Sequence, residues 1–180
     1  MAVLLFVATA FCVYFFRDPA RVIPTGKNLI LSPADGRITE IVEGTDAAAS
    51  GQVWIVRIFL SVFEPHLQRS PIAGKVKSIR YKPGKFLDAR DPKAYFENEQ
   101  NRMEIVAQSG NVSMVVTQIA GLIARRIVCW VKEGQNLAAG ERIGLIRFGS
   151  QVNLAIPRVS TLRVKAGDFV TAGDTVVAEL

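Results

Sequence analysis

The sequence predicts a mainly all-β protein, a β-sandwich or barrel-sandwich preceded by one apolar helix. From Leu29 onward, short runs rich in Val and Ile are separated by Gly, Pro, Asn and Ser, which is typical of strands joined by turns. A glycine-containing frame occurs twice near the C-terminus, and the first sixteen residues carry no charged side chain. At 180 residues, the chain is long enough to bury a core without disulfides.

Residues 1–16, MAVLLFVATAFCVYFF, predict a helix that serves as a membrane anchor. The run is slightly shorter than the roughly 18 apolar residues of a spanning helix, and it lacks the basic region and cleavage site of a secretory signal. An interfacial anchor or the end of a longer hydrophobic region fits equally well. A buried helix of the globular domain is the alternative, but such helices usually have a polar face, which this run lacks.

Residues 17–28, RDPARVIPTGKN, contain two prolines and a glycine and predict an extended linker to a single domain of residues 29–180. The net charge of +6 indicates an acidic partner. Because Lys and Arg are spread along the chain without a nucleic-acid-binding motif, we expect an anionic membrane surface and no nucleic acid. Cys12 and Cys129 are isolated in the sequence, which predicts neither a metal site nor a disulfide.

The repeated frame starts at Val131 (VKEGQNLAAGERIG) and at Val164 (VKAGDFVTAGDTVV), with a fainter copy at Lys82 (KPGKFLDA). Two glycine turns around a short apolar strand predict a compact strand-turn-strand corner. The frame resembles the β-sandwich of biotinyl and lipoyl carrier domains. Those domains carry their cofactor on a hairpin lysine, usually between methionines. No such hairpin occurs here, so the resemblance implies the fold and not the carrier function.

One polar segment interrupts the strand pattern, FLDARDPKAYFENEQNR from Phe86 to Arg102. It contains a proline and four acidic residues, and it predicts a long ordered loop with one helical turn. Long loops in compact domains are often functional, although a plain surface excursion is the simpler alternative.

Three residues are candidates for chemistry: the single histidine His66, Asp35 in the turn SPADG, and Ser150 in RFGSQVNLAIP. Taken alone, a single histidine such as His66 is more often structural or simply exposed than catalytic, and an Asp before Gly in a turn, such as Asp35, usually bonds its own backbone; no spacing joins the two. Ser150 follows Gly149, but a hydrolase elbow needs G-x-S-x-G and a following helix, whereas F-G-S-Q-V leads into an alternating strand. The serine hydrolase interpretation is therefore weak.

A Gly-Ser pair suits a different reaction, self-cleavage of the chain. If the Ser150 hydroxyl attacks the carbonyl carbon of Gly149, an N-to-O acyl shift forms an ester, and elimination then breaks the chain. Glycine leaves this carbonyl open and tolerates strained torsions. The new N-terminus is a dehydroalanine, which hydrolyses to a pyruvoyl group and ammonia. A pyruvoyl ketone can form a Schiff base with a substrate amine and take up the electrons of a decarboxylation.

Several motifs in the same order carry a resemblance over nearly the whole chain. They are FFRDPAR.IP, SPADG, FLS....H..R.P..G, KPGKF..A, NEQN, QIAG..ARRIV.WV..GQ.L..GERIG.IRFGS and the later AIP. By these motifs the chain resembles the short, archaeal-type form of phosphatidylserine decarboxylase.

The resemblance implies cleavage between Gly149 and Ser150 into a β chain of residues 1–149 and an α chain of residues 150–180. These chains would form a heterodimer that can oligomerise further. Ser150 would supply the covalent pyruvoyl cofactor, His66 would transfer protons, and Asp35 would orient or polarise His66. The substrate would be phosphatidylserine, and the products phosphatidylethanolamine and CO2. The resemblance also implies a place at the cell membrane, peripheral or anchored, with the active site on the cytoplasmic side.

Three departures from the family pattern bear on these roles. Long-form members have a second histidine three residues after the first, and Arg69 stands at that place here. Where the short form usually has DVH, this chain has EPH at His66, and FGSRVDL is replaced by FGSQVNL. The changes at Gln151 and Asn153 leave the Gly-Ser pair intact, and we expect them to affect the rate of maturation or the substrate preference.

Loss of CO2 from a carboxylate favours a desolvated pocket, for which Phe59, Phe63 and Phe86 are the apolar candidates. Two alternatives stay open. A binding or carrier module predicts one intact chain and a modified lysine. A pyruvoyl enzyme for a soluble amino acid predicts cleavage together with activity that needs no lipid.

Overall fold

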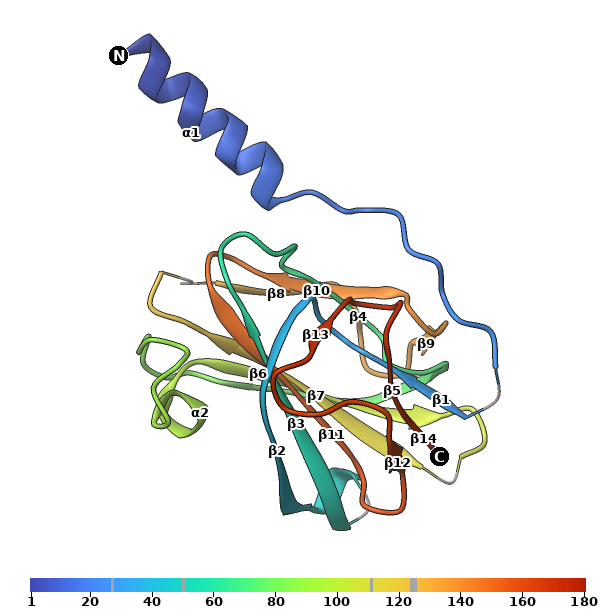
Figure 1. Ribbon diagram of the computed structural model, residues 1–180. Coiled ribbons are helices and arrows are strands. Elements are labelled where there is room, and N and C mark those ends of the chain that lie inside the picture. Colours follow the sequence, from blue (N-terminus) through green and yellow to red (C-terminus); the bar gives the residue numbers. More distant parts are fainter. Residues whose placement is uncertain (27, 50, 111, 124–125) are drawn as a thin grey trace.

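The computed structural model describes residues 1–180 except 27, 50, 111 and 124–125 (Figure 1). An N-terminal helix, α1 (Ala2–Phe15), precedes a body made of strands, so the predicted all-β class with an apolar N-terminal helix is confirmed. Two short helical turns, η1 (Ala47–Ala49) and α2 (Ala94–Glu97), interrupt the strands. The strands are β1 (Leu29–Leu31), β2 (Gly36–Asp46), β3 (Gly51–Leu60), β4 (Leu67–Arg69), β5 (Gly74–Lys82), β6 (Gln100–Ala107), β7 (Ser113–Ala120), β8 (Ile127–Cys129), β9 (Asn136–Leu137), β10 (Arg142–Ile146), β11 (Ser150–Pro157), β12 (Thr161–Leu162), β13 (Phe169–Val170) and β14 (Val176–Glu179).

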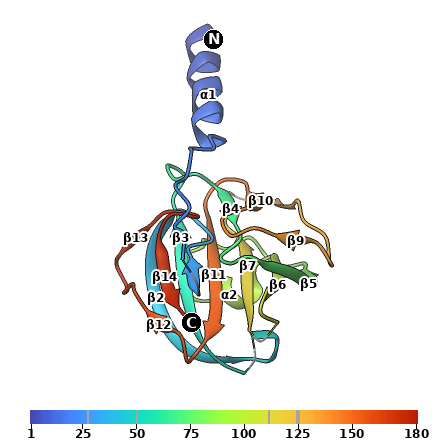
Figure 2. The same ribbon diagram turned by 90° about the vertical axis from the view of Figure 1, so that its right-hand side faces the viewer.

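The strands form one large curled sheet and two small ones that pack on its inner face (Figure 2). The large sheet has the order β13-β2-β3-β11-β7-β6-β5-β9, and the small sheets have the orders β1-β14-β12 and β4-β10-β8. Apolar residues of all three sheets share one core, which includes Val56, Leu154, Met103, Val177 and Ile146. Burial of this core is the main source of the fold's stability.

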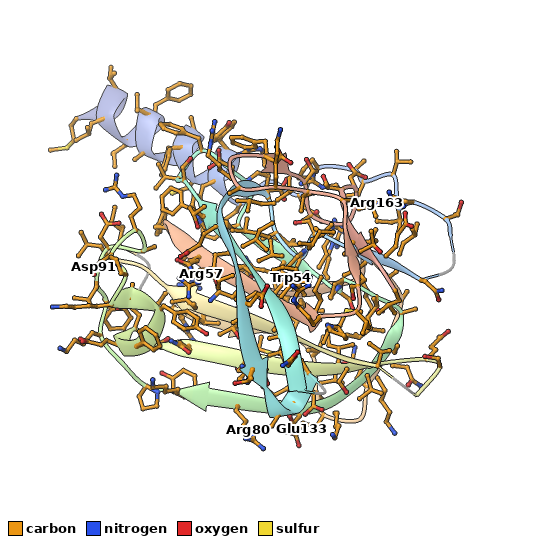
Figure 3. The ribbon with its side chains drawn as sticks, turned by 60° about the horizontal axis from the view of Figure 1, so that its bottom comes forward. Trp54, Arg57, Arg80, Asp91, Glu133 and Arg163 are labelled. Carbon is orange, nitrogen blue, oxygen red and sulfur yellow. The ribbon has the colours of Figure 1, made fainter. Side chains whose placement is uncertain are left out.

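Strand β11 lies in the middle of the large sheet, and all of its residues are buried. Because side chains alternate along a strand, Ser150 and Val152 share the inner face, while Gln151 and Asn153 share the outer face. Part of the outer face is covered by the loop that carries α2. The guanidinium carbon of Arg57, labelled in Figure 3, lies 4.3 Å from the ring centroid of Tyr95 in that loop.

Both strong copies of the glycine frame form the predicted corners. The first supplies β9 and β10, with Gly134 at φ +83° and Gly140 at φ +75°, and the second supplies β13 and β14 around two further glycines with positive φ. The fainter copy at Lys82 does not form a corner. There the chain leaves β5, and Lys85 makes only an isolated bridge with Asn98, because the segment turns to run beside the α2 loop.

The predicted loop of residues 86–102 is confirmed in most of its length: α2 is its one helical turn, and its last residues enter β6. Residues 17–26 have no helix or strand and run along the body of the protein, as Figure 1 shows. Ion pairs hold this segment down, because Asp18 bonds both Arg69 and Arg142, and Arg21 bonds Asp35. In the described part of the chain, no helix combines the length and the apolar character that crossing a bilayer requires.

Candidate active site

Strand register places Ser150 at the point where three strands end. Ser150 is the first residue of β11, and it pairs with Leu60, the last residue of β3, and with Ala120, the last residue of β7. The loops that follow β3 and β7 therefore leave the sheet on either side of Ser150. The first of these loops leads to His66, so register alone brings the candidate histidine and the Gly-Ser pair to the same end of the sheet.

The turn that precedes Ser150 is strained. Phe148 has φ +53° and Gly149 has φ +67°, and a left-handed conformation is uncommon for a residue with a side chain. Such a conformation costs about 1–3 kcal/mol and persists only where the surroundings hold it. The Gly149 backbone N–H donates a hydrogen bond of 2.9 Å to Nε2 of His66, which helps to hold this turn in place.

His66 is only 2% exposed, and the bonds on its ring define a neutral tautomer. Nδ1 lies 2.8 Å from the carbonyl oxygen of Glu64 and must donate to it, while Nε2 accepts from Gly149. Burial lowers the pKa of His66 to about 4; the carbonyl bond to Glu64 opposes this shift, and the positive charge of Arg17 adds to it. At neutral pH the ring is therefore uncharged, with its acceptor nitrogen aimed at the Gly149 amide.

The last helical residue of α1 completes the burial of this histidine. The ring centroid of Phe15 lies 4.3 Å from that of His66 and 4.4 Å from that of Phe148, and Phe15 is only 1% exposed. One turn earlier in α1, the ring of Phe11 stacks on the ring of Phe148, with the ring centroids 6.3 Å apart. The predicted anchor helix is thus also a wall of the candidate site.

The carbonyl group of Gly149 packs against a second glycine, Gly121, which follows β7. A Cβ atom built on Gly121 would lie 2.3 Å from the Gly149 carbonyl oxygen and 3.1 Å from its carbon, so only glycine permits this approach. The Ser150 Oγ is fully buried and has no hydrogen-bond partner among the described residues. Ser150 thus has an unengaged hydroxyl directly after a glycine whose carbonyl group has no side chain of residue 121 against it, so the hydroxyl is free to take part in an N-to-O acyl shift.

A chain of buried amide side chains supports His66 from the core side. Gln68 donates to the His66 carbonyl oxygen (2.7 Å), Gln118 donates to Gln68 (2.8 Å), and Asn101 donates to Gln118 (2.9 Å). Buried polar groups that are fully bonded fix a single arrangement of the elements they join. This chain runs across β6, β7 and β4, so it fixes the backbone of His66 relative to the end of β7.

Asp35 lies in the turn between β1 and β2, and its first partner is Arg21. A single guanidinium nitrogen of Arg21 donates to both carboxylate oxygens, at 2.8 and 2.9 Å. Burial raises the pKa of Asp35, while the charges of Arg21 and Arg17 lower it. Within the described residues, Asp35 makes no hydrogen bond to His66. The positive charge of Arg17 acts on both groups, because it lowers the pKa of each.

An open cleft of about 400 Å³ borders the Gly149 side of the site. Of the three expected phenylalanines, Phe59 lines this cleft, whereas Phe63 stands exposed beside it and Phe86 is half-buried outside its lining. The α2 loop is fixed at the cleft by buried Asn98, which bonds both the backbone of Leu87 and the carbonyl of Ala120. The lining residues are Phe59, Ser61, Val62, Asp88, Ala89, Arg90, Leu122, Ile123, Phe148 and Gly149.

Three residues of this site were not predicted from the sequence: Phe15, Phe148 and Gly121. Phe148 directly precedes the Gly-Ser pair, and Gly121 ends the motif QIAG, so both positions carried a usable signal. Phe15 carried none, because it is one apolar residue in a wholly apolar run. Among the described residues, no group of His, Cys, Asp and Glu could hold a metal ion.

Known proteins are similar to this chain over almost its entire length. The family model described as phosphatidylserine decarboxylase matches residues 8–178. The phosphatidylserine decarboxylase proenzyme of Geotalea uraniireducens is 45% identical over 180 residues, which cover 100% of this chain and 84% of that protein. The proenzyme of Wolbachia pipientis wMel is 47% identical over 177 residues, with 96% and 76% covered, and that of Burkholderia pseudomallei (strain 1106a) is 46% identical over 170 residues, with 94% and 78% covered.

Proposed function

Because the chain belongs to the phosphatidylserine decarboxylase family, we propose that it converts phosphatidylserine to phosphatidylethanolamine and CO2 with a pyruvoyl group made from its own Ser150. The observation that carries this proposal is the buried Ser150 hydroxyl, without a partner among the described residues, directly after a turn in which Phe148 is held at positive φ. The proenzyme names of the relatives support a chain that is processed before it acts.

Self-cleavage would begin at Ser150. Its Oγ bonds to the carbonyl carbon of Gly149, the peptide C–N bond breaks, and the Ser150 nitrogen takes the hydroxyl proton. Loss of the Ser150 Cα proton then breaks the Cβ–O bond and releases the Gly149 carboxylate. The remaining dehydroalanine takes up one water and releases ammonia, which leaves the pyruvoyl ketone at residue 150. Gly121 supports this route because it lets the Gly149 carbonyl sit without a side chain against it.

His66 would hold the turn first and move protons second. Its Nε2 accepts from Gly149, so this hydrogen bond must open before the ring can take the Ser150 proton. A neutral ring near pH 7 is the form that can act as a base. We propose that the same nitrogen later protonates the carbon that loses CO2.

Asp35 would act as a positioning residue. Its ion pair with Arg21 holds in place the segment that joins α1 to β1. Because this segment begins directly after Phe15, the ion pair helps to keep Phe15 packed on His66. This role replaces direct contact with His66, which the described contacts do not include.

A pyruvoyl ketone at residue 150 would supply an electron sink for the decarboxylation. The chain's own contribution is to keep water from the reaction, since residue 150 is fully buried and Phe15, which packs on Phe148, covers His66. Cleavage would not separate the α chain from the β chain. Residues 150–157 stay hydrogen-bonded between β3 and β7, and β13 and β14 stay paired with β2 and β1, so we expect a heterodimer.

A membrane location follows from the substrate and from α1, whose residues Ala2–Tyr14 are exposed and almost wholly apolar. We propose attachment to the cell membrane through α1, assisted by the net charge of +6 at an anionic, cytoplasmic surface.

The test is release of labelled CO2 from phosphatidylserine that carries the label in the serine carboxyl group. We expect release from the lipid and none from free serine, with phosphatidylethanolamine as the other product. Ser150→Ala is the inactive control. Release from free serine at an equal rate would instead support a pyruvoyl enzyme for a soluble amino acid, and release from neither substrate would overturn the proposed activity.

A further inference from the structure

Self-cleavage would change the chemistry of Gly149 as well as that of Ser150. When the chain breaks between them, the carbonyl carbon of Gly149 ends as the C-terminal carboxylate of the β chain, which is charged at neutral pH. Residue 150 ends as an uncharged ketone, because its nitrogen leaves as ammonia. The Gly149 carboxylate is therefore the one charge that cleavage adds to the site.

The new carboxylate would form close to the imidazole of His66. The backbone nitrogen of Gly149 lies 2.9 Å from Nε2 of His66, and the carboxyl carbon is only two bonds away from that nitrogen. Bond lengths alone therefore place this carbon no more than about 5.5 Å from Nε2. An opposite charge at about 4–6 Å favours the charged form of a titratable group, so the carboxylate would stabilise a protonated ring.

The chain before the cleavage point is held by contacts that cleavage does not break. The backbone N–H of Ile146 donates to the carbonyl oxygen of His66 over 3.1 Å. The ring of Phe148 packs on the ring of Phe15, with the centroids 4.4 Å apart. Because both sides of the turn are fixed in this way, we expect Gly149 to stay beside the imidazole after the chain is cut.

Two cations lie on the elements next to the imidazole, and neither can hold a proton on it. Arg17 follows the end of α1, and its positive charge opposes protonation of His66. Arg147 lies on the turn that leads to Gly149, and its side chain is exposed to solvent.

Before cleavage, no carboxylate among the described residues bonds the imidazole. Glu64 meets His66 only through its backbone carbonyl, since the Glu64 carboxylate bonds the hydroxyl of Ser61. The carboxylate of Asp35 bonds Arg21. Burial then keeps His66 neutral, with a pKa of about 4, which suits the base of the acyl shift but not the acid of a later step.

We propose that the C-terminal carboxylate of Gly149 becomes the charge partner of His66 in the mature enzyme, where it accepts a hydrogen bond from Nε2 and holds a proton on the ring. This bond replaces the one from the Gly149 N–H, because a protonated Nε2 can only donate. The inference rests on the proposed self-cleavage. It makes His66 a base before cleavage and an acid afterwards.

The proton on Nε2 has a defined use in the proposed decarboxylation. When CO2 leaves, the electron pair of the broken C–C bond stays with the substrate carbon, and the proton from Nε2 completes the new C–H bond there. The neutral ring regains a proton from water before the next turnover. The Gly149 carboxylate acts only through His66, so it is a positioning group.

NMR titration of His66 in cleaved wild type and in uncleaved Ser150→Ala tests this partner, with the cleavage of each sample established by mass spectrometry. We expect a pKa of about 4 in Ser150→Ala and a clearly higher pKa in wild type, because an opposite charge at this distance strengthens proton binding about 10- to 1000-fold. A cleaved wild type with the same His66 pKa as Ser150→Ala overturns the inference but not the proposed self-cleavage. A wild type that stays one chain overturns both.

Solvation of the ring after cleavage would also raise the His66 pKa, and a second NMR signal separates the two causes. Carbon-13 at the glycine carboxyl position gives one glycine carboxylate resonance in the cleaved protein, that of Gly149, because every other glycine stays in a peptide bond. If the two groups are paired, this resonance shifts with the midpoint of the His66 titration. If it shifts only at the ordinary pKa of a C-terminal carboxyl group, about 3.3–3.7, the inference is overturned.

The pH dependence of the two reactions gives an independent readout. An acid must be protonated, so kcat for decarboxylation should fall as pH rises through the His66 pKa of the cleaved protein. Self-cleavage needs the neutral ring, so it should slow only as pH falls toward about 4. A kcat that stays constant across the pKa measured in wild type would overturn the change of His66 from base to acid.

Discussion

The backbone N–H of Gly149 donates to Nε2 of His66 over 2.9 Å, which joins the residue before the proposed cleavage point to the only histidine of the chain. The bond has two consequences. It holds a strained turn that directly precedes Ser150, and it requires a neutral imidazole, because a protonated Nε2 could not accept it. Cleavage should therefore depend on the charge state of His66.

His66 should titrate with a pKa of about 4, far below its ordinary value of 6.5, because it is buried. The measurement is NMR titration of the imidazole in the Ser150→Ala chain, which stays uncleaved and has no other histidine. A pKa near 6.5 would show that the ring is solvated and would remove the basis for the Gly149 bond.

The same shift predicts how stability depends on pH. Between about pH 6.5 and pH 4 the unfolded chain binds a proton at His66 that the folded chain does not, so stability falls as pH falls through this window. A shift of this size corresponds to about 3 kcal/mol. Urea unfolding of Ser150→Ala should show this loss, and the Ser150→Ala, His66→Gln double variant should lose less over the same window. Equal losses in the two proteins would contradict the prediction.

Phe15 should control the environment of His66. Phe15→Ala removes the ring that lies 4.3 Å from the imidazole, so we expect the His66 pKa to rise toward 6.5 and the fraction of cleaved chain to fall. Phe15→Leu keeps apolar cover and should restore most of both properties. Phe6→Ala is the control, because Phe6 lies on the same helix and is 75% exposed. If Phe6→Ala changes the His66 pKa and the fraction of cleaved chain as much as Phe15→Ala does, these properties do not depend on the contact between Phe15 and His66.

Gly121→Ala should block self-cleavage. Its Cβ would lie 2.3 Å from the Gly149 carbonyl oxygen, so the turn must move away from the geometry that the acyl shift uses. The matched control is Gly44→Ala in β2, where the nearest atom is the mobile end of the Ile55 side chain, 2.9 Å away. Electrophoresis under denaturing conditions follows both variants over time. Normal cleavage of Gly121→Ala would show that self-cleavage does not need the close packing of the Gly149 carbonyl group against residue 121.

The direction in which Asp35→Asn shifts the pKa of His66 distinguishes between two possible roles of Asp35. If Asp35 acts directly on His66, loss of its negative charge lowers the His66 pKa further. If it acts by holding Arg21 and thus the segment behind Phe15, looser packing raises the His66 pKa toward 6.5, which is the result we expect. Removing one partner of a buried ion pair also costs about 3–5 kcal/mol, so an Arg21→Met, Asp35→Asn double variant should regain part of the lost stability.

Pattern in the sequence predicted the parts of the fold that depend on local chemistry. Val- and Ile-rich runs became strands, and the glycine frames at Val131 and Val164 became corners, because alternating burial and positive-φ turns are local requirements. The frame at Lys82 did not form a corner because the segment after Lys82 pairs only through the isolated bridge between Lys85 and Asn98, and a corner needs a neighbouring sheet as well as a turn.

Contacts between distant segments could not be predicted from local pattern. His66 meets Gly149 because β4 pairs with β10 and β3 pairs with β11, and no spacing in the sequence encodes that register. The pair of Arg21 with Asp35 depends on the course of a segment without regular structure. Phe15 faces inward from a helix that is apolar all round, so hydrophobic periodicity could not identify its buried side.

Self-cleavage at Ser150 can be read from the intact mass under denaturing conditions, measured on wild type and Ser150→Ala side by side. Wild type should yield two fragments that meet between residues 149 and 150. The smaller should be about 17 Da lighter than the peptide of residues 150–180, because ammonia is lost when serine becomes pyruvoyl. Ser150→Ala should remain one chain. A single intact mass for wild type, or a smaller fragment with the full mass of an N-terminal serine, would contradict the account.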